Sequence, residues 1–222
     1  LTDYFANPVN RTYERTTSFL IKLAALLARL HEKGISHGEI SSDSLVVEAS
    51  GEPSVRGAGF QAFANLSSDV SMMPSDSCPP ELLNGGSIGP STDAYGLGSI
   101  AYIAFSGYRW TEAFSNVVDA VMSETPPKFL LNGLPEAAWT FTRDLLHKDA
   151  LERPADFKEL AILLNRMRQS EGLSPIMTGI TAIDDNSIFE KESAVAWEGS
   201  GSSSDPSLHP PEAPEPVGEI LE

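Results

Sequence analysis

The sequence is short of cysteine, of positive charge and of long apolar runs. Cys78 is the single cysteine in 222 residues, which excludes an internal disulfide framework and any metal site built from cysteines alone. Lys and Arg number 15 against 31 Asp and Glu, and the formal net charge is −16. Nucleic acids and anionic membrane surfaces require basic patches, so this balance predicts neither as a partner.

Apolar residues never run long enough to span a membrane, and no apolar stretch stands at the start as a signal peptide would. We therefore expect a cytoplasmic chain without a membrane-inserted segment. The sequence begins with Leu1 rather than Met. For this reason we expect it to be an excerpt of a longer protein.

Hydrophobic periodicity predicts a mainly α (α+β) domain over residues 1–168. A wide apolar face marks one long helix over 14–33, with Thr16, Thr17 or Ser18 as its start and Gly34 as its end. Further helices are predicted over 92–106, 114–122, 137–146 and 155–168, and two short strands over 45–48 and 54–56.

The composition changes after about residue 168. From Glu171 onward eleven acidic residues face a single base, Lys191, and a Gly/Ser run is followed by five prolines. Such a segment has too little apolar surface to offset chain entropy, so we predict that 169–222 is largely disordered. Phe189 and Trp197 interrupt it, either as an anchor onto the helical domain, which we favour, or as a short partner-binding motif.

One short segment carries the functional signal. The loop His37-Gly38-Glu39-Ile40-Ser41-Ser42-Asp43-Ser44 ends the long predicted helix and precedes the first predicted strand. This order resembles the catalytic loop of the protein kinase family. In that frame Glu39 stands for the catalytic Asp and Ser44 for the metal-binding Asn, and Gly57 stands where the metal-binding Asp of Asp-Phe-Gly is expected.

Three later segments follow in the order that the same family shows. Pro79-Pro80-Glu81 resembles the Ala-Pro-Glu that closes the activation segment, placed here at 61–78. Asp93 opens a segment similar to the start of the central helix of the large lobe, and 145–154 is similar to the stretch that ends in Arg-Pro. The resemblance implies a kinase-like C-terminal lobe with a β-hairpin at a degenerate catalytic cleft. A Gly-rich loop and a strand lysine, which would mark the N-terminal lobe, are absent from the sequence.

The resemblance also divides the residues by role. Positions for chemistry are lost or altered at Glu39, Ser44 and Gly57. Positions for the framework are kept: it implies a buried Glu81–Arg153 ion pair, an Asp93 that accepts hydrogen bonds from the loop backbone, and a packing role for His37. This pattern predicts a pseudokinase that acts as a scaffold or regulator for a protein partner, with no metal and no cofactor.

Two alternatives remain open. The first is a divergent serine/threonine protein kinase that binds ATP and magnesium with the help of a missing N-terminal lobe. The second is a helical domain unrelated to kinases that matches by chance. Residues upstream of Leu1 would best separate the pseudokinase from the divergent kinase, because a Gly-rich loop and a strand lysine there would favour the kinase.

Overall fold

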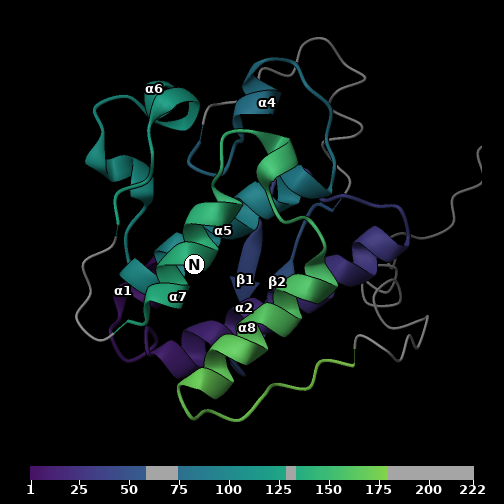
Figure 1. Cartoon of the computed structure of the whole chain (residues 1–222), viewed down its shortest axis with the longest axis vertical. Coiled ribbons are helices and arrows are strands. Elements are labelled where there is room, and N and C mark those ends of the chain that lie inside the picture. Colours follow the sequence, from purple (N-terminus) through teal and green to yellow (C-terminus); the bar gives the residue numbers. More distant parts are fainter. Residues whose placement is uncertain (59–74, 129–133, 180–222) are drawn as a thin grey trace, which may run out of the picture. The chain divides into compact units, whose positions relative to one another are not determined.

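The computed structural model describes residues 1–58, 75–128 and 134–179 (Figure 1). All of these residues belong to one unit, Leu1–Ala182. Its helices and a small two-stranded sheet confirm the mainly α prediction. Most of the predicted activation segment, the aromatic pair Phe189 and Trp197 and nearly all of the acidic tail lie outside the described residues.

The long helix α2 spans Tyr13–Glu32 and agrees with the prediction except at its start. The predicted start at residues 16–18 is wrong, because the hydroxyl of Thr12 caps the helix by accepting from the Arg15 N–H. Thr16 is instead buried inside the helix, where its hydroxyl donates to the Ala104 carbonyl at 3.1 Å. This bond ties α2 to α5, the central helix Pro90–Ser106.

Helix α5 is buried over almost its whole length, as its uniformly apolar sequence predicts. It ends where predicted, because Gly107 adopts the left-handed conformation (φ +82°) and donates its N–H to the Ile103 carbonyl. Gly96 brings α5 against the loop after α2: a Cβ at this position would lie 2.6 Å from the Ile40 carbonyl oxygen. The central helix therefore needs glycine at that crossing.

We expect Gly96→Ala to lower the free energy of unfolding by about 2 kcal/mol, because the added methyl meets backbone that cannot move aside cheaply. The sign is informative, since alanine in a helix interior is intrinsically better than glycine by about 1 kcal/mol. Gly89→Ala is the control: no atom lies within 4 Å of its added Cβ, and a loss below about 1 kcal/mol is expected. Urea melts measure both, and a Gly96→Ala chain as stable as the parent would contradict the close approach.

The remaining helices surround α2 and α5. Helix α8 packs mainly on α2, and α7 packs on α5. Their predicted positions are right to within a few residues, and the caps explain the shifts: Asn116 Oδ1 accepts from Val118 N–H at the start of α6, and Asp156 Oδ1 from Lys158 N–H at the start of α8. Bounds are α1 Thr2–Ala6, α4 Pro80–Leu83, α6 Val117–Ser123, α7 Glu136–Leu145 and α8 Phe157–Ser170, with 3₁₀ turns at Trp110–Ala113 and Ala150–Glu152. The sequence did not predict α1, α4 or the 3₁₀ turns.

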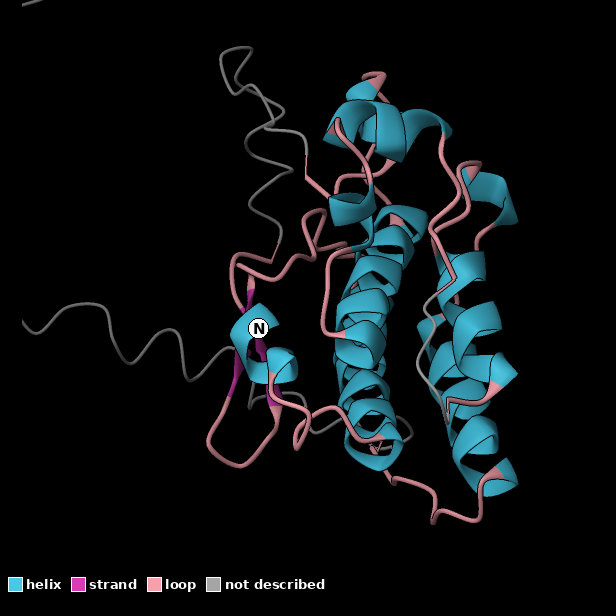
Figure 2. Cartoon of the chain, turned by 90° about the vertical axis from the view of Figure 1, so that its left-hand side faces the viewer, coloured by secondary structure: helices cyan, strands magenta, loops and turns pink. Residues whose placement is uncertain are grey.

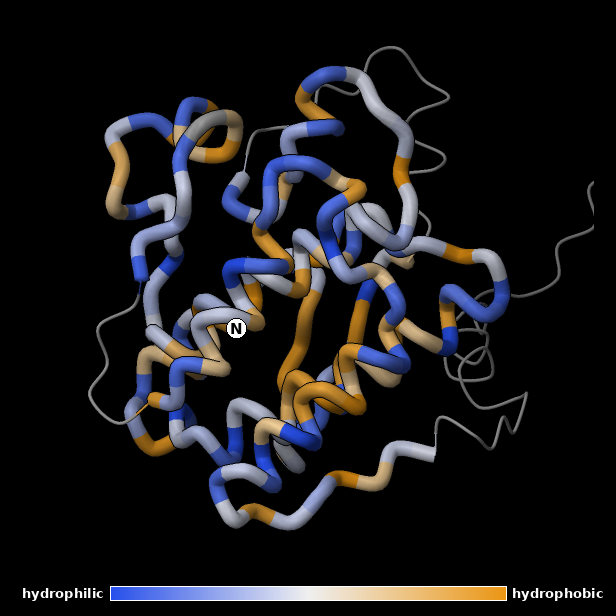
Figure 3. The backbone as a smooth tube through the Cα atoms, viewed as in Figure 1, coloured by the Kyte–Doolittle hydropathy of each residue, from blue (hydrophilic) through white to orange (hydrophobic). Residues whose placement is uncertain are grey.

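The sheet is the predicted hairpin, with β1 over Leu45–Val47 and β2 over Pro53–Val55. The strands pair antiparallel, with Leu45 opposite Val55. The hairpin lies to one side of the helices, and β2 contacts α2 (Figure 2). The strands and the middle of the helical layers carry the most hydrophobic stretches of the backbone (Figure 3). The loop between α2 and β1 thus leads from the helical core into the hairpin.

The chain just after α8 is held against the helices. Asn165 exchanges hydrogen bonds with the backbone of Ile176 in both directions, at 2.7 and 3.0 Å. Arg29 on α2 donates to the Thr178 carbonyl at 2.8 Å. Among the described residues, no helix is long and apolar enough to cross a membrane.

Candidate functional site

The loop between α2 and β1 is fastened to α5 by one carboxylate. Asp93, fully buried in the first turn of α5, accepts from the His37 N–H at 2.8 Å and from the Gly38 N–H at 2.7 Å. Bonds to an ionised acceptor are stronger than bonds between neutral groups. The backbone of the loop is therefore fixed at its first two residues.

A third partner of Asp93 was not predicted from the sequence. His31, in the last turn of α2, places Nε2 2.7 Å from Asp93 Oδ2, and its ring meets the Phe157 ring edge-on at 4.6 Å between centroids. The sequence analysis gives a packing role to His37 and no role to His31. The signal that was available is that a buried carboxylate needs partners and that His31 lies six residues before His37 in the sequence.

The side chain of His37 ties the loop to the end of the hairpin. Its Nε2 lies 2.8 Å from the Arg56 carbonyl oxygen, and its Nδ1 lies 3.2 Å from the Glu39 nitrogen. Since the Glu39 N–H can only donate, this network puts the ring proton on Nε2. His37 is thus a framework residue that fixes the backbone next to Gly57.

Ser44 is engaged within the loop itself. Its hydroxyl accepts from the Ser41 N–H at 2.9 Å and donates to the Ser41 carbonyl at 3.2 Å. The Ser44 N–H in turn donates to the Ser41 hydroxyl at 3.3 Å. The two serines close a tight turn whose hydrogen bonds are mutual, while the carboxylates of Glu39 and Asp43 are exposed.

Gly57 follows the hairpin in a left-handed conformation (φ +77°). It is exposed, and no heavy atom lies within 4 Å of the place where a Cβ would stand. Side chains other than glycine rarely adopt this backbone conformation. In residues 1–58, 75–128 and 134–179, no group of three or more His, Cys, Asp or Glu side chains is placed to hold a metal ion.

A second network, missed by sequence reasoning, joins the loop to the segment before α4. Arg109 donates to the Ser42 hydroxyl at 2.9 Å and to Asp76 Oδ1 at 3.4 Å. Asp76 is buried, and it also accepts from Ser99 on α5 at 3.1 Å. Burial raises the pKa of Asp76, while the neighbouring Arg109 opposes that rise. No motif pointed to this Arg–Asp pair, because its partners are 33 residues apart and lie on opposite sides of α5 in the sequence.

Arg153 and Glu81 form a bidentate ion pair between the end of the lobe and α4. Both Arg153–Glu81 contacts are 2.7 Å long, and the guanidinium is fully buried. The same guanidinium also donates to three carbonyls, at residues 91, 147 and 148. It lies 4.9 Å from the centroid of the Tyr95 ring. Every guanidinium N–H of Arg153 therefore has a partner.

Lys148 stands beside this pair without joining it. Its Nζ donates to the Ala120 carbonyl at 3.1 Å and lies 4.6 Å from the centroid of the Trp110 ring. Burial, and then the charge of Arg153, lower the pKa of Lys148 to about 8. Ring and carbonyl contacts therefore hold Lys148, and the charge of Glu124 partly opposes the fall in its pKa.

Comparison with known proteins gives distant relatives. No family model matches the chain. It is 24% identical over 171 residues to the serine/threonine-protein kinase PknK of Mycobacterium tuberculosis, a match that covers 73% of this chain and 15% of that protein. It is 28% identical over 152 residues to the serine/threonine-protein kinase drp72 of Corynebacterium efficiens, covering 64% and 28%. The chain spans less than a third of either relative, and the similarity supports a kinase-like relationship over part of the chain.

Proposed function

We propose that this chain is a catalytically inactive, kinase-like large lobe that binds other proteins as a scaffold or regulator. The observation that carries the proposal is Gly57, which offers no side-chain ligand at the position that the kinase resemblance gives to the metal-binding Asp. Its left-handed backbone (φ +77°) also disfavours replacement by a residue with a side chain.

The other side-chain oxygens near the loop are not suited to bind a pair of magnesium ions. Protein kinases hold two Mg²⁺ between the nucleotide and two side chains, an Asp and the catalytic-loop Asn. Here the hydroxyl of Ser44 is neutral and already hydrogen bonded to Ser41. Magnesium prefers charged or carbonyl oxygens in strict octahedral geometry. Glu39 and Asp43 are the exposed carboxylates of the loop, and neither stands at a metal position of the kinase frame.

The framework supports a binding role. Asp93 fixes the loop to α5, and the Glu81–Arg153 pair fixes α4 to the end of the lobe. A lobe held in this way presents a rigid surface, and binding requires no metal. We keep Phe189 and Trp197, outside the described residues, as predicted partner-binding candidates.

We expect the chain to show no magnesium-dependent binding of ATP at micromolar concentration. Calorimetric titration and thermal melts, each with Mg²⁺ and with EDTA, measure this. A nucleotide present at a hundred times its dissociation constant would stabilise the fold by about 2.7 kcal/mol, which is a visible shift. A shift that requires Mg²⁺ would contradict the proposal.

The runner-up is a divergent serine/threonine kinase, supported by what the relatives are named and by the exposed Glu39 carboxylate. In that case residues upstream of Leu1 would supply the nucleotide site. The discriminating experiment is a phosphorylation assay with a longer protein that includes those residues. Phosphate transfer that Glu39→Gln abolishes, with the fold intact, would favour the kinase over the scaffold.

A further inference from the structure

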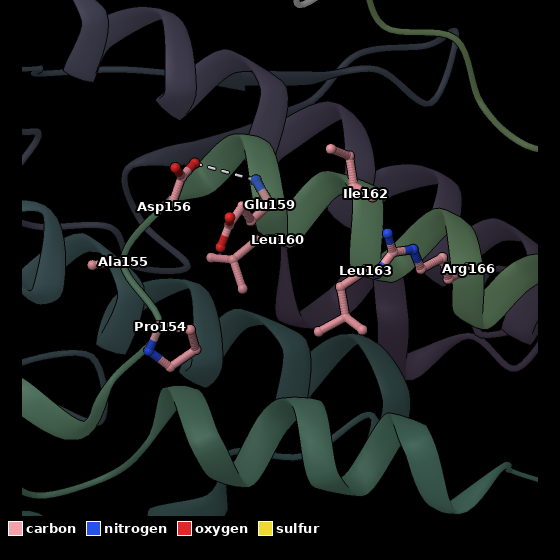
Figure 4. A pocket seen from close by; sticks show the side chains of 8 residues that line it. All are labelled: Pro154, Ala155, Asp156, Glu159, Leu160, Ile162, Leu163 and Arg166. Carbon is pink, nitrogen blue, oxygen red and sulfur yellow. Dashed lines mark hydrogen bonds between the residues drawn. The ribbon is translucent and has the colours of Figure 1, made fainter.

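The outward face of α8 carries two exposed aliphatic side chains. Ile162 is 50% exposed and Leu163 is 42% exposed, although the opposite face of α8 is part of the core. With residues 154–156 and the side chains of Glu159 and Arg166, they border a hollow of about 510 Å³ (Figure 4). The face is therefore apolar at its middle and charged at both ends.

The charges on this face have opposite signs and are placed symmetrically. Glu159 lies three residues before Ile162, and Arg166 lies three residues after Leu163. At 3.6 residues per turn the four side chains fall within an arc of about 100°. A line perpendicular to the helix, midway between Ile162 and Leu163, thus has an acid on one side and a base at the same distance on the other.

We propose that this face binds the same face of a second copy of the chain, with the two α8 helices antiparallel about a twofold axis. Such an interface is isologous, so every contact occurs twice. Glu159 of each copy would meet Arg166 of the other, and Ile162 would meet Leu163. The next positions outward are also compatible: the polar Asp156 would face the polar Gln169, and the small Ala155 would face the small Ser170.

Charge complementarity selects a second copy as the occupant. The partner that fits is a helix that presents a base, two aliphatic residues and an acid opposite the acid, the two aliphatic residues and the base of α8. An antiparallel copy of α8 does this. Within the described residues no ion pair involves Glu159 or Arg166, whereas the neighbouring Lys158 pairs with Glu32 on α2. Both charged residues are exposed and thus accessible to an external partner.

The proposal goes beyond the scaffold function and holds whether or not the chain transfers phosphate. One helix face is smaller than a standard protein–protein interface, which buries 1,200 Å² or more, as an order of magnitude. We therefore expect a reversible dimer that dissociates on dilution rather than an obligate one.

Sedimentation equilibrium of the 222-residue chain over a range of concentrations tests the proposal. The parent chain is expected to dimerise. Glu159→Arg and Arg166→Glu should each weaken self-association at least about tenfold, because each places like charges opposite one another twice. Glu112→Arg reverses an exposed acid on a different element and should leave the association unchanged.

Mixing the two reversed variants gives the sharpest result. In a mixed pair, both arginines of one chain face both glutamates of the other, so a heterodimer should form with nearly the affinity of the parent. Far-UV circular dichroism and urea midpoints verify that each variant is folded. A parent chain that stays monomeric at millimolar concentration, single variants that associate as the parent does, or a mixture no tighter than either variant alone would each overturn the proposal.

Discussion

Replacing Arg153 with Ala is expected to lower the free energy of unfolding by about 3–5 kcal/mol. The side chain is fully buried, and its loss leaves the Glu81 carboxylate and three carbonyls without their donor. With a slope of about 2 kcal/mol per molar urea, the midpoint should fall by about 1.5–2.5 M. Arg153→Lys should recover little, because an ammonium cannot reproduce the bidentate fork.

The exposed pair Arg143–Asp144 is the matched control. Both side chains are about half exposed, with an N–O distance of 2.7 Å like that of the buried pair. Exposed pairs contribute about 0–1 kcal/mol, so Arg143→Ala should shift the midpoint little. Glu39→Ala, at an exposed position of the loop, should also cost little. Equal midpoints for Arg153→Ala and Arg143→Ala would count against the buried pair and against the kinase-like framework.

Asp93→Ala is expected to cost about 3 kcal/mol or more. The substitution removes one buried carboxylate and leaves two loop N–H groups, at His37 and Gly38, and the His31 ring without their acceptor. The stability of Asp93→Asn should lie between that of the parent and that of Asp93→Ala. The amide keeps one oxygen acceptor, but its NH₂ group, a donor, replaces the other oxygen and faces groups that are themselves donors.

Asp144→Ala, at the exposed carboxylate of the control pair, should lower the free energy of unfolding by less than about 1 kcal/mol. A second measurement separates loss of the loop from general loss of stability. In native-state hydrogen exchange, the His37 and Gly38 amides should lose more protection in Asp93→Asn than amides in the middle of α7. Uniform loss of protection would mean that Asp93 supports the whole fold rather than the loop.

Helix positions could be predicted because they depend on local pattern. The apolar period of α2 and the unbroken apolar run of α5 follow directly from the sequence, and the left-handed glycines Gly34 and Gly107 end both helices as predicted. The start of α2 was misplaced because three hydroxyl residues, 16–18, offered plausible caps. Thr12 is the N-cap instead, because burial of Thr16 and Thr17 against other elements favours a longer helix.

The candidate site divides in the same way. The loop at His37, the glycine at 57 and the ends of the Glu81–Arg153 pair could be named from spacing and residue type through the kinase resemblance. The contacts of His31 with Asp93 and of Arg109 with Asp76 and Ser42 could not, because they join side chains 33 to 67 residues apart and neither His31 nor Arg109 belongs to a motif.

By itself the sequence determined the mainly α class, the order of the longer helices, and the absence of a ligand-bearing side chain at Gly57. Each of these depends on residue identity or on neighbours within a few positions. The tertiary structure alone decided that one carboxylate, Asp93, gathers two loop amides and a histidine, and that the hydroxyl of Ser44 is occupied by Ser41. It also decided which face of α8 stays uncovered, because burial depends on where α2 packs and no local pattern specifies that.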